Sequence, residues 1–241
     1  MSFSSTGISY LMISISLSIL TFRLFQYWRD KRDLTSRLFA FFGIFLCSFL
    51  LVRALSGIFF LDNYDVLIFS VYIVVFLQTI ATSIMGYLIS YLLLPKISPW
   101  IISSLAFLFG LFVTYLSTKI GYVIDIREWG SISWNFRNST LGLVFGILRS
   151  LLLAIAFVPM AVVMIQQGRK GEDKLMRRRS LGLGIILLGG MLIGFLDFII
   201  VGFLNFNIIY RDITTCIMAV VILVVVILTQ KPSKQYKERI E

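Results

Sequence analysis

Seven long apolar stretches, separated by short polar segments, run along almost the whole chain. They lie near residues 7–27, 37–60, 66–94, 99–117, 141–166, 181–203 and 207–229. A helix of about 20 apolar residues is long enough to cross the roughly 30 Å hydrocarbon core of a bilayer. The pattern therefore predicts an all-α, polytopic membrane protein: a seven-transmembrane helix bundle that forms a single domain over residues 1–241.

The longest polar segment, residues 118–140, carries a different pattern. Apolar and polar side chains alternate on both sides of residues 128–130, which is typical of two paired strands joined by a turn. We therefore expect an outer β-hairpin between the fourth and fifth helices. Two interpretations stay open: a lid over the mouth of the bundle, or a flap whose Trp129 and Trp134 rest among the lipid headgroups.

The composition supports the membrane assignment and narrows the chemistry. Of the 241 residues, 59% are hydrophobic and 14% are charged, whereas a soluble domain is about half apolar and about a quarter charged. The absence of histidine and the presence of only two cysteines, Cys47 and Cys216, exclude most metal sites, haem ligation and histidine acid–base chemistry. No nucleophile or phosphate-binding loop accompanies the acids inside the spans. We expect no enzyme activity, no cofactor and no metal site.

The basic residues lie mostly on one side of the predicted membrane. Fifteen of the 22 lysines and arginines fall in the first, third and fifth loops and in the C-terminal tail, against three in the opposite loops. Because basic loops stay in the cytoplasm, this bias predicts an outer N-terminus and a cytoplasmic C-terminus. It also accounts for most of the net charge of +10 without a nucleic-acid partner, for which no motif is present.

The fifth loop, Arg169–Arg179, is the most basic segment. With the basic tail it can serve as a topology signal alone, or can contact anionic lipid headgroups or a cytoplasmic signalling protein. The expected partners are therefore the lipid bilayer, in an integral protein of the bacterial cytoplasmic membrane, and a signalling protein that docks on this loop and tail.

Charged residues inside the spans are the strongest indication of a site. Each costs about 2.5–3.5 kcal/mol to insert, so such residues face the interior of the bundle and pair there. Glycines one and two turns before Arg149 and Asp197 mark those faces as helix contacts. All five charges fall in the outer half of the predicted membrane, and Gln78 adds an amide nearer its middle. The five are Arg53, Arg149, Asp197, Arg211 and Asp212.

These residues allow two interpretations. Three arginines and two aspartates leave one formal positive charge, which suits a small anionic ligand or headgroup, and the ligand-binding residues are then the five charges with Gln78. The alternative is structural: Arg53 or Arg149 pairs with Asp197, while Arg211 and Asp212 are wetted near the membrane surface. Even such a pair can act as a switch, because breaking it costs several kcal/mol.

Four features of the layout occur together in one known family. The first helix ends in a basic loop, Arg29 to Arg32; the second and third loops are short; a tryptophan-containing outer segment precedes the fifth helix; and the fifth loop is basic. In this layout the chain resembles the N-terminal seven-transmembrane region of bacterial histidine kinases. The resemblance implies a sensory role. No kinase domain follows Gln230, so we expect the signal to pass to another protein.

We therefore expect a non-enzymatic sensor or receptor-like module that detects a small anionic ligand or a membrane state at the outer charged layer and signals to a separate cytoplasmic protein. The alternatives are a small transporter or channel, and a structural or assembly subunit of a membrane complex. The inner half of the spans is almost free of ionisable groups, which speaks against a transport path lined by charges.

Overall fold

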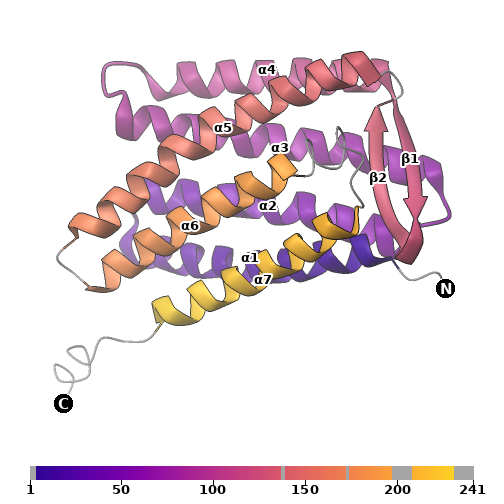
Figure 1. The fold of residues 1–241 in the computed structure, drawn as a ribbon. Helices are drawn as coiled ribbons and strands as arrows, with labels where there is room; N and C mark the ends of the chain where they lie inside the picture. The colour runs from indigo at the N-terminus through magenta and orange to yellow at the C-terminus, as the bar shows by residue number, and fades with distance from the viewer. Residues whose placement is uncertain (1–3, 137–138, 172–173, 197–207, 231–241) are drawn as a thin grey trace.

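The computed structural model describes residues 4–136, 139–171, 174–196 and 208–230. Its long helices run roughly alongside one another, and two short strands lie across one end of them (Figure 1). The helices are α1 (Ser5–Lys31), α2 (Leu34–Phe59), α3 (Tyr64–Leu93), α4 (Pro99–Ile120), α5 (Ser139–Lys170), α6 (Lys174–Leu196) and α7 (Ile209–Gln230).

Six helices in the described part of the chain, α1 to α5 and α7, are long and apolar enough to cross a membrane. The protein is therefore an integral membrane protein built as an all-α bundle, as the sequence predicts. The structure describes α6 up to residue 196 and the chain again from residue 208. The end of the predicted sixth span, residues 181–203, therefore lies outside the described residues. The expectation that residues 169–179 form a loop is wrong for most of that segment, because α5 continues to Lys170 and α6 begins at Lys174.

Short polar turns bring consecutive helices side by side. Asp33 caps α2 and Asn63 caps α3, each by accepting a hydrogen bond from the backbone N–H three residues later. Pro99 occupies the first turn of α4, where its missing N–H costs nothing. With so few residues between them, α1, α2, α3 and α4 pack as successive antiparallel neighbours, and α5 packs on α6. The last helix, α7, packs on the first, α1.

Small residues set the distances between these helices. A Cβ on Gly57 of α2 would stand 3.1 Å from the Gly7 Cα of α1, so neither position has room for a side chain. Between α3 and α4, the hydroxyl oxygens of Ser83 and Ser103 lie 2.9 Å apart and form a hydrogen bond. The first four helices thereby form a closely packed group.

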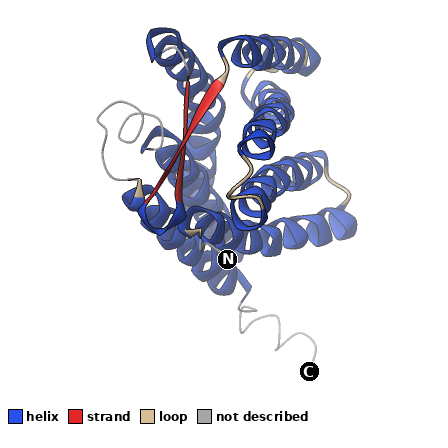
Figure 2. Cartoon of the chain, turned by 90° about the vertical axis from the view of Figure 1, so that its right-hand side faces the viewer, coloured by secondary structure: helices blue, strands red, loops and turns tan. Residues whose placement is uncertain are grey.

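The strands β1 (Tyr122–Arg127) and β2 (Ser131–Phe136) pair antiparallel and are joined by a single 3-10 turn, Glu128–Gly130. We call residues 122–136 the hairpin, and the end of the bundle that it covers the hairpin end. The hairpin reaches from the side of α4 and α5 to the side of α1 and α7 (Figure 1), and it crosses the end of the bundle in the view along the helices (Figure 2).

The hairpin packs onto the bundle through one apolar face. Ile124 and Ile132 are buried against Leu61, in the turn before α3, and Leu67, in its first turns. Burial of such side chains stabilises a contact by about 1.5–3 kcal/mol each. The hairpin is therefore a fixed part of the fold that closes over one end of the bundle.

Candidate functional site

A cavity of about 550 Å³ lies inside the bundle, under the hairpin. All seven helices and both strands contribute to its wall. Along α2 the wall runs from Arg53 to Phe39, and along α1 from Tyr10 to Leu24; each stretch corresponds to about 21 Å of helix. Small-molecule sites in proteins occupy about 300–1,000 Å³, so this cavity has the size of a ligand site.

Arg53 enters the cavity from α2. It is buried, with 8% of its surface exposed, and its Cζ lies 3.8 Å from the centroid of the Trp134 ring on β2. This is a cation–π contact beneath the hairpin. Trp134 lines the cavity as well, whereas Trp129 in the turn is 68% exposed. Of the two tryptophans expected at headgroup level, Trp129 alone is exposed and Trp134 packs inward.

Arg149 enters the cavity from α5 and donates a hydrogen bond from Nη2 to Oε1 of Gln78 on α3. The structure thus brings together the charge of the fifth helix and the amide near the middle of the third. Gly142 and Gly146 line the same wall, so the glycine-bearing face of α5 does point into the bundle. Because an amide is neutral, this hydrogen bond supplies no counter-charge to Arg149.

No aspartate or glutamate is among the described residues that line the cavity. Two arginines line the cavity among mostly apolar side chains. Asp197, predicted to share this site, lies outside the described residues, and so does any pairing of Asp197 with Arg53 or Arg149.

The hairpin contributes two buried hydrogen-bond donors to the wall of the cavity. The Tyr122 hydroxyl and the Trp134 indole N–H are buried and have no hydrogen-bond partner among the described residues. Both residues line the cavity. A buried donor that lacks an acceptor costs about 1–3 kcal/mol. A ligand that carries acceptor oxygens would remove this cost.

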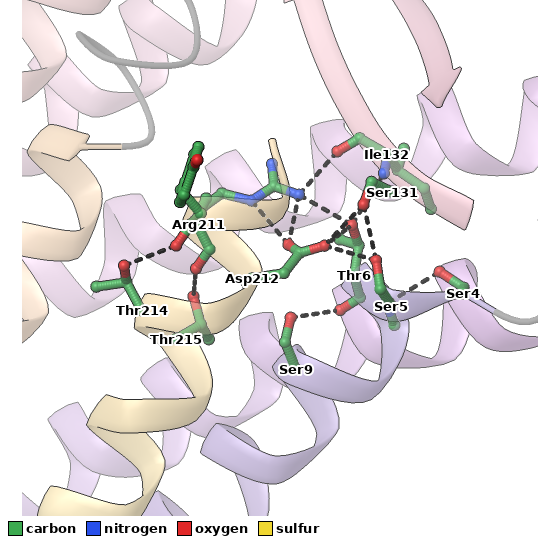
Figure 3. A network of polar contacts seen from close by, with 12 residues as sticks. Ser4, Ser5, Thr6, Ser9, Ser131, Ile132, Arg211, Asp212, Thr214 and Thr215 are labelled. Carbon is green, nitrogen blue, oxygen red and sulfur yellow. Dashed lines mark hydrogen bonds and ion pairs between the residues drawn. The ribbon is translucent and has the colours of Figure 1, made fainter. Parts of the chain in front are cut away.

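Arg211 and Asp212 form a separate buried pair at the start of α7 (Figure 3). Arg211 Nη2 lies 2.9 Å from Asp212 Oδ1, and the two residues are 3% and 4% exposed. Neither is among the residues that line the cavity. The alternative in which both are wetted at the membrane surface is therefore wrong, because the hairpin and the first turn of α1 cover them.

This pair holds the hairpin to two helices (Figure 3). Asp212 Oδ2 accepts hydrogen bonds from the hydroxyls of Ser5 and Thr6 on α1, each at 2.8 Å. Arg211 Nη2 donates to the Ile132 carbonyl of β2, and the Ile132 N–H donates to Thr6 Oγ1, each at 2.9 Å. We call these five residues the latch. The latch joins β2 to the first turns of α1 and α7.

The latch and the cavity meet at one side chain. Arg211 Cζ lies 5.8 Å from the centroid of the Trp134 ring, within range of a second cation–π contact, while Arg53 stacks on the same ring. The six residues predicted from the sequence thus divide into three groups: Arg53, Gln78 and Arg149 at the cavity, Arg211 and Asp212 in the latch, and Asp197 outside the described residues.

Sequence reasoning missed the hydroxyl partners of Asp212 and the donors that the hairpin supplies. A usable signal existed for the first: residues 4–6 are all hydroxyl-bearing and directly precede an apolar span. For Tyr122 and Trp134 the alternation predicts strands, but it does not tell which face of the hairpin meets the helices.

Comparison of the chain with protein-family models, with curated proteins and with solved structures finds no match.

Proposed function

We propose that this protein is a non-enzymatic, receptor-like membrane module that binds a small anionic ligand in the cavity under the hairpin and passes the binding event to a separate cytoplasmic protein. The observation that carries the proposal is the cavity under the hairpin: it has the size of a ligand site, and Arg53 and Arg149 line it.

The chemistry of the wall selects for an anion. Arginine presents planar N–H donors that suit carboxylate, phosphate and sulfonate groups, and hydrogen bonds to an anion are about twice as strong as those between neutral groups. Arg149 donates a hydrogen bond to the neutral amide oxygen of Gln78. An anion would add an opposite charge, which this amide does not carry.

The fold links the cavity to several helices. Arg53 belongs to α2, Arg149 to α5 and Trp134 to β2, and β2 is held to α1 and α7 by the latch. A ligand that contacts these three side chains therefore favours one relative position of the helices over another. Such a difference in binding between two states is what a receptor needs to signal.

The charge bias of the sequence supports an orientation for this module. We place the hairpin end outside and the basic end of α5 and α6, from Arg169 to Arg179, in the cytoplasm of a bacterial cell. On this orientation the ligand site lies in the outer half of the membrane. The basic helix ends and the tail then face a cytoplasmic signalling protein, in keeping with the layout resemblance to sensory membrane regions.

Binding can be tested with Trp134 as the reporter. In a W28F/W100F/W129F variant, Trp134 is the remaining tryptophan of the chain. Titration of this variant with butyl phosphate in phosphatidylcholine nanodiscs is expected to change Trp134 emission, and butylammonium is expected to leave it unchanged. Adding R149Q should weaken phosphate binding by about tenfold or more, since a hydrogen bond to a charged group contributes about 1.5–3 kcal/mol.

Two controls make this test decisive. R127Q removes an exposed arginine of the hairpin that pairs with Asp125, and it should leave the affinity unchanged. Equal binding of butylammonium, or an affinity that ignores Arg149, would reject the site. Butyl phosphate flux into proteoliposomes above the protein-free rate would support the transporter alternative in place of the receptor.

A further inference from the structure

A groove of about 310 Å³ lies on the outer surface of the bundle between α1 and α2. Phe22 and Phe25 of α1 and Ile44 of α2 belong to its wall, and each is 39–59% exposed. Both helices are long and apolar enough to cross a membrane. Because the exposed side of such a helix faces the hydrocarbon of the bilayer, the groove opens toward lipid.

Three polar groups of the groove wall make their hydrogen bonds within the two helices. The Ser48 hydroxyl donates to the Ile44 carbonyl at 2.9 Å, and the Thr21 hydroxyl and the Cys47 thiol form a hydrogen bond across 3.5 Å. A polar group that is already bonded does not need a polar partner from the molecule beside it. The groove therefore suits an acyl chain.

Aromatic rings connect the groove to Arg37, at the end of the bundle away from the hairpin (Figure 1). The ring of Phe25 in the groove wall meets Trp28 edge to face, with 5.2 Å between their centroids, and Trp28 lies 6.1 Å from Phe41 of α2. Arg37 Cζ lies 5.8 Å from the Trp28 centroid and 5.6 Å from that of Phe41. These distances are within range of cation–π contacts, which hold the arginine beside the rings.

Two further arginines lie on the face of α1 that carries the groove. Arg29 and Arg32 follow Phe25 by four and seven residues, which places them on the same side of the helix, and both are exposed. We call Arg29, Arg32 and Arg37 the basic cluster. In residues 29–37 four basic residues stand against two acids. The end of the groove is therefore positively charged, and its guanidinium groups suit a phosphate.

The distance between the groove and the basic cluster matches the depth of one leaflet. Phe22 and Arg32 are separated by about 15 Å along α1, and Cys47 and Arg37 by about 15 Å along α2. Half of a hydrocarbon core of roughly 30 Å is also about 15 Å. A headgroup at the basic cluster therefore lets an acyl chain pass the rings and enter the groove.

We propose that the groove and the basic cluster bind a phospholipid with a negatively charged headgroup. Its phosphate contacts Arg29, Arg32 and Arg37, and one acyl chain lies in the groove. A zwitterionic phospholipid fits the same groove but brings a second cation to the cluster, so charge favours the anionic lipid. Among the described wall residues of the groove, only Thr21 also lines the cavity. The lipid site is thus independent of a ligand under the hairpin.

Tryptophan quenching by brominated phospholipid measures which lipid lies at the site. W100F/W129F/W134F, the sole-Trp28 variant, reports on the basic cluster, and W28F/W129F/W134F leaves Trp100. Trp100 is the matched control: it is exposed in the first turn of α4, which lies at the same end of the bundle (Figure 1). In mixed phosphatidylglycerol and phosphatidylcholine bilayers, brominated in turn, the preference for phosphatidylglycerol should be about fivefold or more greater at Trp28, because each basic residue contributes about that factor.

Separate variants test the cluster and the groove. In the sole-Trp28 variant, R37Q should lower the phosphatidylglycerol preference about fivefold. R23Q should leave it unchanged, since Arg23 is exposed on the other side of α1. S48L fills the groove, and S104L makes the same change on the exposed side of α4. Native mass spectrometry should show phosphatidylglycerol retained by the parent protein and S104L and lost from S48L. Thermal unfolding checks that each variant folds.

Each contrary result overturns the inference. Equal lipid preferences at the two tryptophans, or equal effects of R37Q and R23Q, would reject the basic cluster. Retention of phosphatidylglycerol by S48L at the level of S104L would reject the groove. If neither brominated lipid quenches Trp28, protein and not lipid covers this face, and the inference fails as well. Butyl phosphate binding under the hairpin is measured separately, so the failure of one proposal leaves the other standing.

Discussion

The guanidinium of Arg53 lies over the indole ring of Trp134, with 3.8 Å between its Cζ and the ring centroid. This contact joins α2 to the hairpin and places a buried charge at the wall of the cavity. Because Arg211 of the latch approaches the same ring, Trp134 connects the cavity to the element that fastens the hairpin. Four predictions follow from this arrangement of charges and hydroxyls.

Replacing Trp134 with leucine should lower the free energy of unfolding. The change removes a ring face that two arginines contact, and a desolvated cation–π contact contributes about 2 kcal/mol. W134F keeps a weaker ring and should lose less. W129L is the matched control: Trp129 is 68% exposed, and its replacement should change stability by less than about 0.5 kcal/mol. Thermal unfolding in nanodiscs measures all three, and equal losses in W134L and W129L would contradict the contact.

Removing the carboxylate of the latch should be far more damaging. D212N leaves Arg211 buried without its ion-pair partner, and loss of one partner from a buried pair costs about 3–5 kcal/mol. In the exposed pair of the hairpin, Arg127 Nε lies 2.7 Å from Asp125 Oδ2. D125N should cost less than about 1 kcal/mol there, because solvent screens that pair. Denaturation of the two variants side by side gives the comparison, and similar losses would show that Asp212 is not the buried anchor.

Thr6 should control how firmly β2 is held. Its hydroxyl donates to Asp212 and accepts from both Arg211 and the Ile132 N–H. T6V keeps the shape but removes all three bonds, so the Ile132 amide loses its acceptor and should exchange its hydrogen much faster. T6S keeps the hydroxyl and should preserve slow exchange. Hydrogen exchange of hairpin peptides measures the protection of the Ile132 amide, and unchanged protection in T6V would argue against the latch.

A carboxylate at position 78 should compete with the ligand. In Q78E the new acid lies beside Arg149 and supplies the counter-ion that the cavity wall lacks among its described residues. We expect alkyl phosphate affinity to fall about tenfold or more, because the anion now meets a compensated arginine. Q78M is uncharged and of similar size, and should weaken binding less. Trp134 fluorescence titration distinguishes the two, and an unchanged affinity in Q78E would place the anion elsewhere.

The sequence predicts the helices well because length and apolar character alone decide which segments can cross a bilayer. It also marks Arg53 and Arg149 as inward-facing, since the cost of a charge in lipid is independent of the details of the fold. It cannot assign partners. Arg149 bonds Gln78, 71 positions away in the chain, and Asp212 bonds Thr6, 206 positions away. Such pairings depend on which helices become neighbours, which no local pattern encodes.

The division of the charges into a cavity and a latch was out of reach for the same reason. From the sequence, Arg211 and Asp212 stand one turn inside the seventh span, near enough to the membrane surface to be wet. They are dry because a segment from the middle of the chain folds over them, as the contact with Ile132 shows. Burial here comes from the hairpin and not from the depth of the residues in the span.

The hairpin is also a strut of fixed length. It is continuous with α4 and α5 at one end, and at the other the latch ties it to α1 and α7 (Figure 1). Each of its strands has six residues, which extend over about 20 Å. The spacing between these two groups of helices at the hairpin end is therefore set by a rigid bar. A displacement of Trp134 away from the cavity must either break the hydrogen bonds of the latch or tilt α5 together with the hairpin. The displacement of one side chain can thus move a whole helix.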